Sequence, residues 1–317
     1  MTVTPDLAVV VLNWNNAEDT LECLTSLRES TSPLEVIVVD NGSTDGSAEA
    51  IDASGLADTL IRTGANLGYS GGNNIGLQHA IDSGREFVCV LNNDTLVEPE
   101  TFGRLRDYLR SRPADVAVSP TIHYADDQAK IWFAGGTLDR GWPRHLQPLE
   151  IPPSDALLKG SELLTGCCIV ARREVWSRVG LFDDRYFLIF EDSDWSMRAR
   201  KAGIDLMISR EGRLLHKVSR SFRDTAPSLL GTFYFIRNGL RFEWDHCRRF
   251  LPRFLSQWVL RPTLRDLRSR KSLQPHLFAL FGAASFVVSQ SGTAPRLVQW
   301  TARLASRRRP HPFRRTS

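Results

Sequence analysis

Hydrophobic positions in the first 120 residues form short continuous runs that alternate with helix-like stretches. Three runs are rich in β-branched residues and end in polar turns: LAVVVLN (7–13), LEVIVVD (34–40) and EFVCVLNND (86–94). Continuous apolar runs of this length are typical of strands buried in a parallel sheet. Helices are predicted between these runs, at 17–30, 45–54 and 71–83. The alternation predicts an α/β fold with a mostly parallel central sheet flanked by helices.

Polar residues gather where these predicted strands end, at Asn13–Asn16, Asp40–Gly46 and Asn92–Asp94. Ligands of open parallel sheets bind beyond the carboxyl ends of the strands, so the sequence predicts a site there. Two roles remain open for Asp40: turn formation, or a hydrogen bond to a ligand's base or sugar. Two also remain for Asp94: capping the following helix, or holding a hard divalent cation that carries diphosphate oxygens.

A glycine-rich stretch, RTGANLGYSGGNNIGLQ (62–78), precedes and enters the third predicted helix. Its five glycines would let backbone N–H groups approach an anion at a helix N-terminus. The stretch matches neither the dinucleotide-binding GxGxxG pattern after a strand nor the P-loop pattern. A ligand loop and a tight connection therefore remain equal interpretations.

The second half of the chain is less regular. Residues 113–165 contain six prolines and predict an irregular wall over the sheet, with β-like character at 131–146. Further helices are predicted at 171–184, closed near Gly180, and at 192–203, closed by Gly203. Amphipathic helices are predicted at 228–268 and 274–290.

The segment EDSDW (191–195) places three carboxylates directly after the apolar run RYFLIF. Crowded or desolvated carboxylates cost free energy unless a cation or a proton transfer uses them. Glu191, Asp192 and Asp194 are therefore candidates for catalytic work.

Charge is distributed unevenly along the chain. Residues 246–317 carry fifteen Arg or Lys and one acid, Asp266, for a net charge of +14, whereas residues 1–245 carry −10. A basic tail on an acidic body predicts contact with an anionic surface, either a membrane or a polyanion. The longest apolar run of the tail has twelve residues (277–288), fewer than the roughly twenty that span a bilayer.

Overall composition is that of a globular protein of 317 residues, 42% hydrophobic and 24% charged. The five cysteines lack CxxC spacing, which argues against a disulfide framework or a zinc site and favours a reducing cytosol. The N-terminal residues show no basic segment followed by an apolar one, so we expect no export signal.

Taken together, six motifs resemble those of family 2 glycosyltransferases, in the family's order and over about residues 7–240. They are VVVLNWNN, VVDNGSTDGS, NLGYSGGNNIG, LNNDT, the stretch from TGCCIVARREVW to EDSDWSMRARKAG, and HKVSRSF. The nearest branch is rhamnosyltransferase-like and galactofuranosyltransferase-like. The resemblance implies the GT-A nucleotide-diphospho-sugar transferase fold with a C-terminal helical appendage, divided as 1–227 and 228–317.

The resemblance also implies a donor site. Asp40 matches the aspartate that contacts the nucleotide base, and Asp94 matches the last acid of the metal-binding DxD motif. Asn92 replaces the first acid of that motif, which puts metal dependence in question. The other implied donor-site residues are Asn13, Asn15, Asn66, Gly68, Asn73 and Asn93.

The same resemblance implies that Asp192 is the general base of an inverting displacement, with Glu191 supporting it. His216 matches a metal-coordinating histidine, and Mg²⁺ or Mn²⁺ would stabilise the leaving diphosphate. Gly166 is expected to let the acceptor pass close to the backbone, and Trp195 is expected either to stack on a sugar or to pack in the core. For Asp194, a salt bridge with Arg198 and a role in acceptor binding remain open.

The sequence therefore predicts an inverting glycosyltransferase that moves a sugar from a nucleotide diphosphate to a lipid-linked or polysaccharide acceptor in envelope assembly. The favoured donor is dTDP-L-rhamnose, followed by UDP-sugars. The basic tail predicts peripheral binding to anionic lipid on the cytoplasmic face of the membrane, and an oligomer is compatible with it. The alternatives are a catalytically inactive sugar-nucleotide-binding protein and a polyanion-binding protein; the helical spacing of the tail's apolar residues argues against a nucleic-acid partner.

Overall fold

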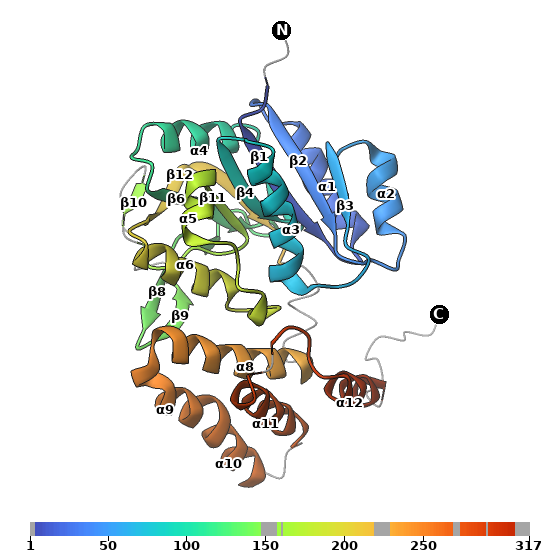
Figure 1. Ribbon diagram of the computed structural model, residues 1–317, viewed down its shortest axis with the longest axis vertical. Coiled ribbons are helices and arrows are strands. Elements are labelled where there is room, and N and C mark those ends of the chain that lie inside the picture. The colour runs from blue at the N-terminus through green and yellow to red at the C-terminus, as the bar shows by residue number, and fades with distance from the viewer. Residues whose placement is uncertain are drawn as a thin grey trace. The chain divides into compact units, whose positions relative to one another are not determined.

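The computed structural model describes residues 4–146, 157–159, 161–218, 229–268, 273–289 and 291–307. They fall into two compact units, whose described residues are 4–218 and 229–307 (Figure 1). The domain boundary expected at 227/228 and the last ten residues of the basic tail lie outside the described residues.

The first unit is built on one large mixed sheet, in the order β10-β12-β6-β11-β4-β1-β2-β3, with β5 paired to β12 and β7 to β6. A separate hairpin pairs β8 with β9. The strands are β1 (Leu7–Asn13), β2 (Leu34–Asp40), β3 (Thr59–Arg62), β4 (Phe87–Asn92), β5 (Thr95–Val97), β6 (Val116–Tyr124), β7 (Ile131–Phe133), β8 (Gly136–Asp139), β9 (Trp142–His145), β10 (Leu157–Lys159), β11 (Cys168–Arg172) and β12 (Asp205–His216).

Helices cover this sheet and make up the second unit. In the first unit they are α1 (Ala17–Arg28), α2 (Ser47–Ser54), α3 (Gly68–Asp82), α4 (Thr101–Arg110), α5 (Arg173–Val179), the 3₁₀ turn η2 (Asp184–Tyr186) and α6 (Glu191–Lys201). In the second unit they are α8 (Leu229–His246), η3 (Arg248–Phe250), α9 (Leu251–Phe254), the π-helical η4 (Leu255–Leu260), α10 (Arg261–Arg268), α11 (Gln274–Val287) and α12 (Arg296–Arg307).

The order of the strands identifies the edge of the sheet at which a ligand is expected. The chain moves outward from β1 through β2 to β3, then returns across the sheet to β4 on the other side of β1. The strands β1, β2, β3 and β4 are parallel, so β1 and β4 flank a topological switch point. Ligands of open α/β sheets bind beyond the carboxyl ends of the strands at such a point. The register puts Asn13 beside Asp40, and Leu12 beside Asn92, at that edge.

The glycines of α3 let this helix pack closely on the sheet. A Cβ on Gly76 would lie 2.4 Å from a methyl carbon of Val10, and one on Gly72 would lie 2.5 Å from Leu12 Cδ1. These contacts are too short for any larger residue. Part of the glycine-rich stretch is therefore a tight helix–sheet contact rather than a ligand loop.

Three features of the fold differ from the sequence prediction. The helix expected at 171–184 begins as the antiparallel strand β11, and only residues 173–179 are helical. The helix expected at 228–268 is divided by turns after His246. The helix α3 begins at Gly68, inside the glycine-rich stretch. A short apolar run such as that of β11 cannot be assigned to a strand or a helix by periodicity alone.

The second unit packs its helices around α8. Gly282 of α11 lies against the backbone of α8, where a Cβ would come within 2.6 Å of Phe233 O. Among the described residues, no helix is both long and apolar enough to cross a membrane.

Candidate active site

The carboxyl ends of β1 and β2 share a buried hydrogen-bond network. Asn13 Nδ2 donates to Asp40 Oδ1 (2.8 Å) and to the hydroxyls of Ser43 (3.1 Å) and Ser47 (3.0 Å). Thr20 donates its hydroxyl to Asn13 Oδ1 at 2.8 Å, and the Ser43 N–H donates to Asp40 Oδ2. Asn13 is fully buried and orients Asp40. Each carboxylate oxygen still has a lone pair for a ligand.

Asn15 and Asn93 lie close to this network. Asn15 is exposed, adopts φ of +51° and accepts the Thr44 N–H at 2.8 Å. Asn93 donates to the Thr20 hydroxyl at 2.8 Å. Asn15 is therefore available at the rim, whereas Asn93 fixes the turn after β4.

Asn41, which the sequence analysis did not select, holds the loop that enters α3. Its Nδ2 donates to Gly68 O (3.0 Å) and Asn66 Oδ1 (3.2 Å), and its Oδ1 accepts the Leu67 N–H (2.9 Å). The sequence signal that could have identified Asn41 is its position directly after Asp40 in the motif VVDNGSTDGS. Asn73 is fully buried on α3, and its Oδ1 has no hydrogen-bond partner among the described residues.

The turn after β4 meets the end of β12. The register of β5 against β12 pairs Thr95 with His216, and this brings Asp94 to the histidine. His216 Nε2 lies 3.1 Å from Asp94 Oδ1, and both residues are buried. The ring of Trp132 packs on the His216 ring, edge to face, with centroids 4.3 Å apart. Two residues 122 positions apart in sequence thus form one carboxylate–imidazole pair.

This pair fits a divalent cation. Adjacent ligands on an octahedral cation with bonds of about 2.1 Å lie about 3 Å apart, close to the observed separation. Asp94 and His216 would be the protein ligands, and diphosphate oxygens and water would supply the rest. Within the described residues, no group of three or more acidic, histidine or cysteine side chains could hold a metal alone.

Glu191 and Asp192 lie at the N-terminus of α6. Asp192 Oδ2 accepts the Gly166 N–H at 2.9 Å, and its Oδ1 accepts the Ser193 N–H at 2.6 Å. Asp192 is partly exposed. Glu191 is buried, and burial together with the Asp192 charge raises its pKa to about 8. At neutral pH Glu191 is therefore largely a neutral acid beside an available carboxylate.

Tyr69, a residue that the sequence analysis did not select, lies between the end of β4, which leads to Asp94, and Gly166, which bonds to Asp192. Its hydroxyl lies 2.7 Å from Gly166 O and 3.0 Å from Asn92 Oδ1. Burial, followed by the charges of Glu191, Asp192 and Asp94, raises its pKa well above the usual value, so the phenol stays protonated.

The apolar approach to α6 is a strained turn. Phe187, Ile189 and Phe190 all adopt positive φ, at 57°, 72° and 78°. Such φ values are uncommon for bulky residues and are costly. The turn is fastened to the start of α3, because Tyr69 N donates to Phe187 O at 2.6 Å and Gly68 leaves no room for a Cβ against Phe187.

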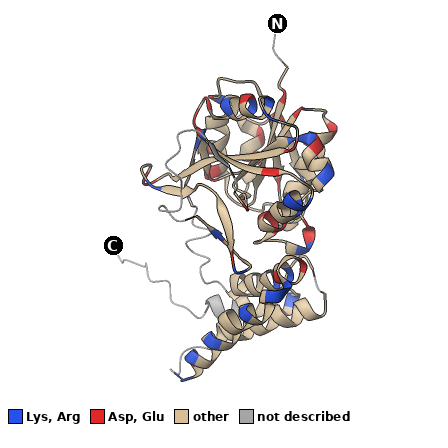
Figure 2. Ribbon diagram, turned by 90° about the vertical axis from the view of Figure 1, so that its left-hand side faces the viewer, with Lys and Arg blue, Asp and Glu red and all other residues tan. Residues whose placement is uncertain are grey.

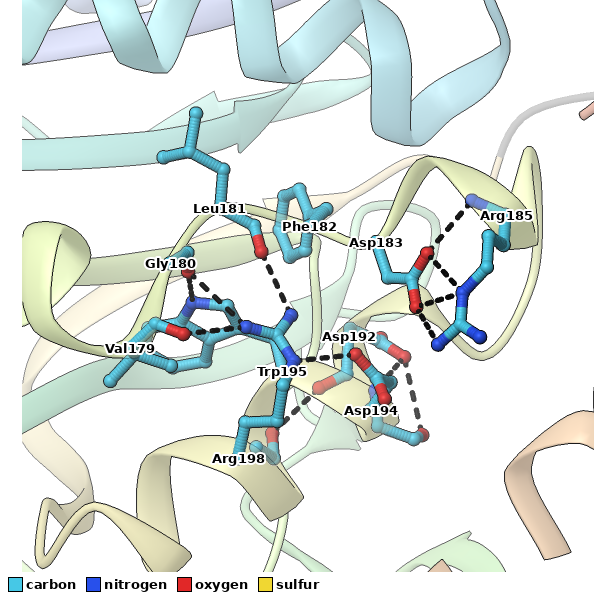
Figure 3. Close-up of polar contacts among 12 residues, drawn as sticks. Val179, Gly180, Leu181, Phe182, Asp183, Arg185, Asp192, Asp194, Trp195 and Arg198 are labelled. Carbon is cyan, nitrogen blue, oxygen red and sulfur yellow. Dashed lines mark hydrogen bonds and ion pairs between the residues drawn. The ribbon is translucent and has the colours of Figure 1, made fainter. Parts of the chain in front are cut away.

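Asp194 and Trp195 are structural residues. Asp194 is 2% exposed and pairs with Arg198 Nε at 2.8 Å, and Arg198 also donates to the carbonyls of Val179 and Leu181 (Figure 3). Trp195 is fully buried, donates to Gly180 O and packs on Trp176 with ring centroids 4.7 Å apart. The expectation that Trp195 binds substrate is wrong, because its ring has no solvent-facing surface. For Asp194, the salt bridge holds α6 in place.

The β8–β9 hairpin forms the wall expected from residues 131–146. Trp142 packs on Phe190, directly before Glu191, with ring centroids 5.6 Å apart. His145 packs on Trp132 at 4.9 Å, and burial lowers the pKa of His145. The hairpin therefore contacts both the turn that carries the base and the aromatic group beside His216.

The switch point between β1 and β4, the Asp40 network, the Asp94–His216 pair and the Asp192 carboxylate thus belong to one α/β unit. The profile of Glycosyl transferase family 2 matches residues 8–180. The chain belongs to this family and is a glycosyltransferase, which confirms the resemblance drawn from its motifs.

Individual relatives agree with this assignment. The chain is 30% identical over 301 residues to N-acetylglucosaminyl-diphospho-decaprenol L-rhamnosyltransferase of Mycobacterium tuberculosis, covering 85% of this chain and 97% of the relative. It is 24% identical to galactofuranosyltransferase GlfT1 of the same organism, covering 86% and 88%. The mannosyltransferase PcManGT of Pyrobaculum calidifontis, solved with GDP-Man and Mn²⁺, superposes with a TM-score of 0.54 at 20% identity, covering 96% and 81%. This last likeness confirms the expected fold.

Proposed function

We propose that the chain is an inverting rhamnosyltransferase that uses dTDP-L-rhamnose and a lipid-linked acceptor. The observation that carries the inverting mechanism is Asp192, a partly exposed carboxylate held by two backbone N–H groups at a helix N-terminus. The names of the mycobacterial relatives support the sugar and the acceptor class.

The reaction is a single displacement. The acceptor hydroxyl oxygen attacks the anomeric carbon, its proton passes to an Asp192 oxygen, and the bond from that carbon to the diphosphate oxygen breaks with its electron pair. Neutral Glu191 adds no second charge beside the base. A divalent cation on Asp94 and His216 would neutralise the departing diphosphate. Asp40, held by Asn13, would accept a hydrogen bond from the base of the nucleotide.

A donor screen tests this assignment. Purified protein with Mn²⁺ or Mg²⁺ is incubated with dTDP-L-rhamnose, UDP-galactofuranose, UDP-N-acetylglucosamine and GDP-mannose, and nucleoside diphosphate release is measured with and without a polyprenyl-diphosphate-linked sugar. We expect acceptor-stimulated release of dTDP. Equal inactivity with every donor would contradict the function, and preference for another donor would correct the sugar.

We also propose that the second unit binds anionic membrane on the cytoplasmic face, where a lipid-linked acceptor would be reached. Leu260, at the end of η4, and Leu264 and Leu267, on α10, are all at least half exposed. Their spacing of four and three residues places them on one helical face. Next to this face lie three exposed arginines of α10: Arg261, Arg265 and Arg268. Figure 2 colours the Lys and Arg positions along the ribbon blue. An apolar stripe bordered by arginines is the pattern of helices that lie in a bilayer interface.

Vesicle co-sedimentation tests the membrane proposal. Each arginine near an anionic leaflet contributes on the order of 1 kcal/mol, so Arg261→Gln, Arg265→Gln and Arg268→Gln combined should weaken binding to phosphatidylglycerol vesicles on the order of a hundredfold. The matched control replaces three surface arginines of the first unit, Arg104, Arg173 and Arg178. Equal binding to phosphatidylcholine vesicles, or an equal loss in the control, would contradict the proposal.

A further inference from the structure

Three hydrogen bonds connect the Asn92 position to the proposed base. The Tyr69 hydroxyl lies 3.0 Å from the side-chain amide of Asn92 and 2.7 Å from Gly166 O. The Gly166 N–H then donates to Asp192 Oδ2 at 2.9 Å. Residue 92 belongs to the metal-binding motif of the family, so this network joins the motif to the general base.

The Tyr69 hydroxyl has one proton but lies near two carbonyl oxygens. Because Gly166 O is the nearer and has no alternative form, it takes the proton. The phenol oxygen can then only accept from Asn92. An amide presents either its oxygen or its NH₂ group after a half-turn of the side chain. With Nδ2 toward Tyr69, both short contacts become hydrogen bonds.

An aspartate at position 92 could not make this arrangement. A carboxylate only accepts, so it would compete with Gly166 O for the single phenol proton. The losing oxygen would face the phenol oxygen with no proton between them, and the 165–167 turn would have to move. Space there is limited, since a Cβ on Gly166 would lie 2.9 Å from the Tyr69 hydroxyl oxygen.

We propose that Asn92 is a positioning residue: its amide holds the Tyr69 hydroxyl on Gly166, and Gly166 holds Asp192 where it takes the acceptor proton. The asparagine is then a requirement of this chain's base rather than a weakened metal ligand. The inference rests on the proposed role of Asp192.

The test restores the acidic motif. With dTDP-L-rhamnose and Mn²⁺, Asn92→Asp should lower kcat tenfold or more, while the donor KM and the dTDP affinity measured by calorimetry stay within threefold. Tyr69→Phe should behave alike, and the double variant should lose no more than either single one, because all three break one network. Tyr108→Phe on α4 removes a hydroxyl outside the network and should leave kcat unchanged. If Asn92→Asp retains kcat and needs less Mn²⁺, position 92 is a metal ligand and the inference is wrong.

A second measurement does not depend on the donor. The side-chain NH₂ resonances of Asn92, assigned by their loss in Asn92→Asp, should shift in Tyr69→Phe and not in Tyr108→Phe. Unchanged resonances in Tyr69→Phe would overturn the proposed hydrogen bond. If the wild-type enzyme is inactive with every donor, the proposed function fails, whereas this measurement still decides the contact.

Discussion

The residues around Asp40 and those around Asp192 lie at one end of the same unit, but they satisfy their polar groups differently. Asn13 and Asp40 bond to each other and to nearby hydroxyl and N–H groups, and Asn41 bonds through both its amide atoms to the loop 66–68. On the other side, Glu191 Oε2 is buried with no partner among the described residues, and Phe187, Ile189 and Phe190 hold positive φ.

We infer that the residues around Asp40, the donor side, serve mainly to bind the donor, whereas those around Asp192, the base side, serve mainly in catalysis. A network that is already satisfied would lose little freedom when a nucleotide binds, so a donor site around Asp40 would be preorganised. Strained backbone and a desolvated acid each cost about 1–3 kcal/mol and persist only where surrounding contacts enforce them. On the base side these contacts are the hydrogen bond from Tyr69 N of α3 to Phe187 O and the bonds by which Arg198 holds α6. We therefore expect changes on the two sides to act on different kinetic constants.

The sharpest test removes the base. Asp192→Asn keeps the size of the side chain but cannot take a proton, so kcat should fall about 10²- to 10⁴-fold. Affinity for dTDP, measured by calorimetry, should stay within threefold. A kcat within a few-fold of the wild-type value would remove Asp192 from this role.

Removal of the metal should affect both sides at once. Exhaustive chelation should lower turnover about a hundredfold or more and weaken dTDP binding, with both restored by Mn²⁺, since the cation would join the donor diphosphate to Asp94 and His216. His216→Ala should raise the Mn²⁺ concentration needed, whereas His123→Ala on β6 should not. Full activity after chelation would mean that the pair only stabilises the fold.

A matched pair of asparagines tests the comparison directly. Asn41→Ala frees the loop at Gly68 and should raise the donor KM about tenfold with little change in kcat. Asn74→Ala on α3 also loses bonds of both amide atoms, but these hold Phe182 in the segment leading to the base. It should lower kcat about tenfold instead. Equal effects of both variants on KM and kcat would show that the two sides are one unit.

The sequence predicted the donor side better than the base side. Strands β1, β2 and β4 are continuous apolar runs, and their polar ends indicated the edge of the sheet at which the structure places the switch point. Asp94 and His216 were predicted to share a site only through the family resemblance, since the strand β12 was not predicted. Tyr69 was missed, and the role of Trp195 was left open between the core and the site, because an aromatic side chain in a polar motif gives no sign of which way it faces.

The smallest expected effect on activity comes from Glu191, whose main influence is on how the stability of the protein changes with pH. Burial and Asp192 raise its pKa from 4.5 to about 8 in the folded chain. Between these values the folded chain keeps a proton that the unfolded chain releases, so this group lowers stability as pH rises from about 4.5 to 8. Glu191→Gln resembles the neutral acid at every pH. Its free energy of unfolding should match the wild type near pH 4.5 and exceed it by a few kcal/mol near pH 8, with kcat at pH 7 within tenfold.

Urea unfolding across this pH range measures the difference between the two proteins, which removes the titration of all shared groups. Glu174→Gln is the matched control, because the pKa of that exposed carboxyl is lowered rather than raised, with Arg173 bonding to it. It should give no gain with rising pH. If the Glu191→Gln difference stays flat from pH 4.5 to 8, Glu191 ionises normally in the fold. The base side would then carry no desolvated acid, and its contrast with the donor side would rest on backbone strain alone.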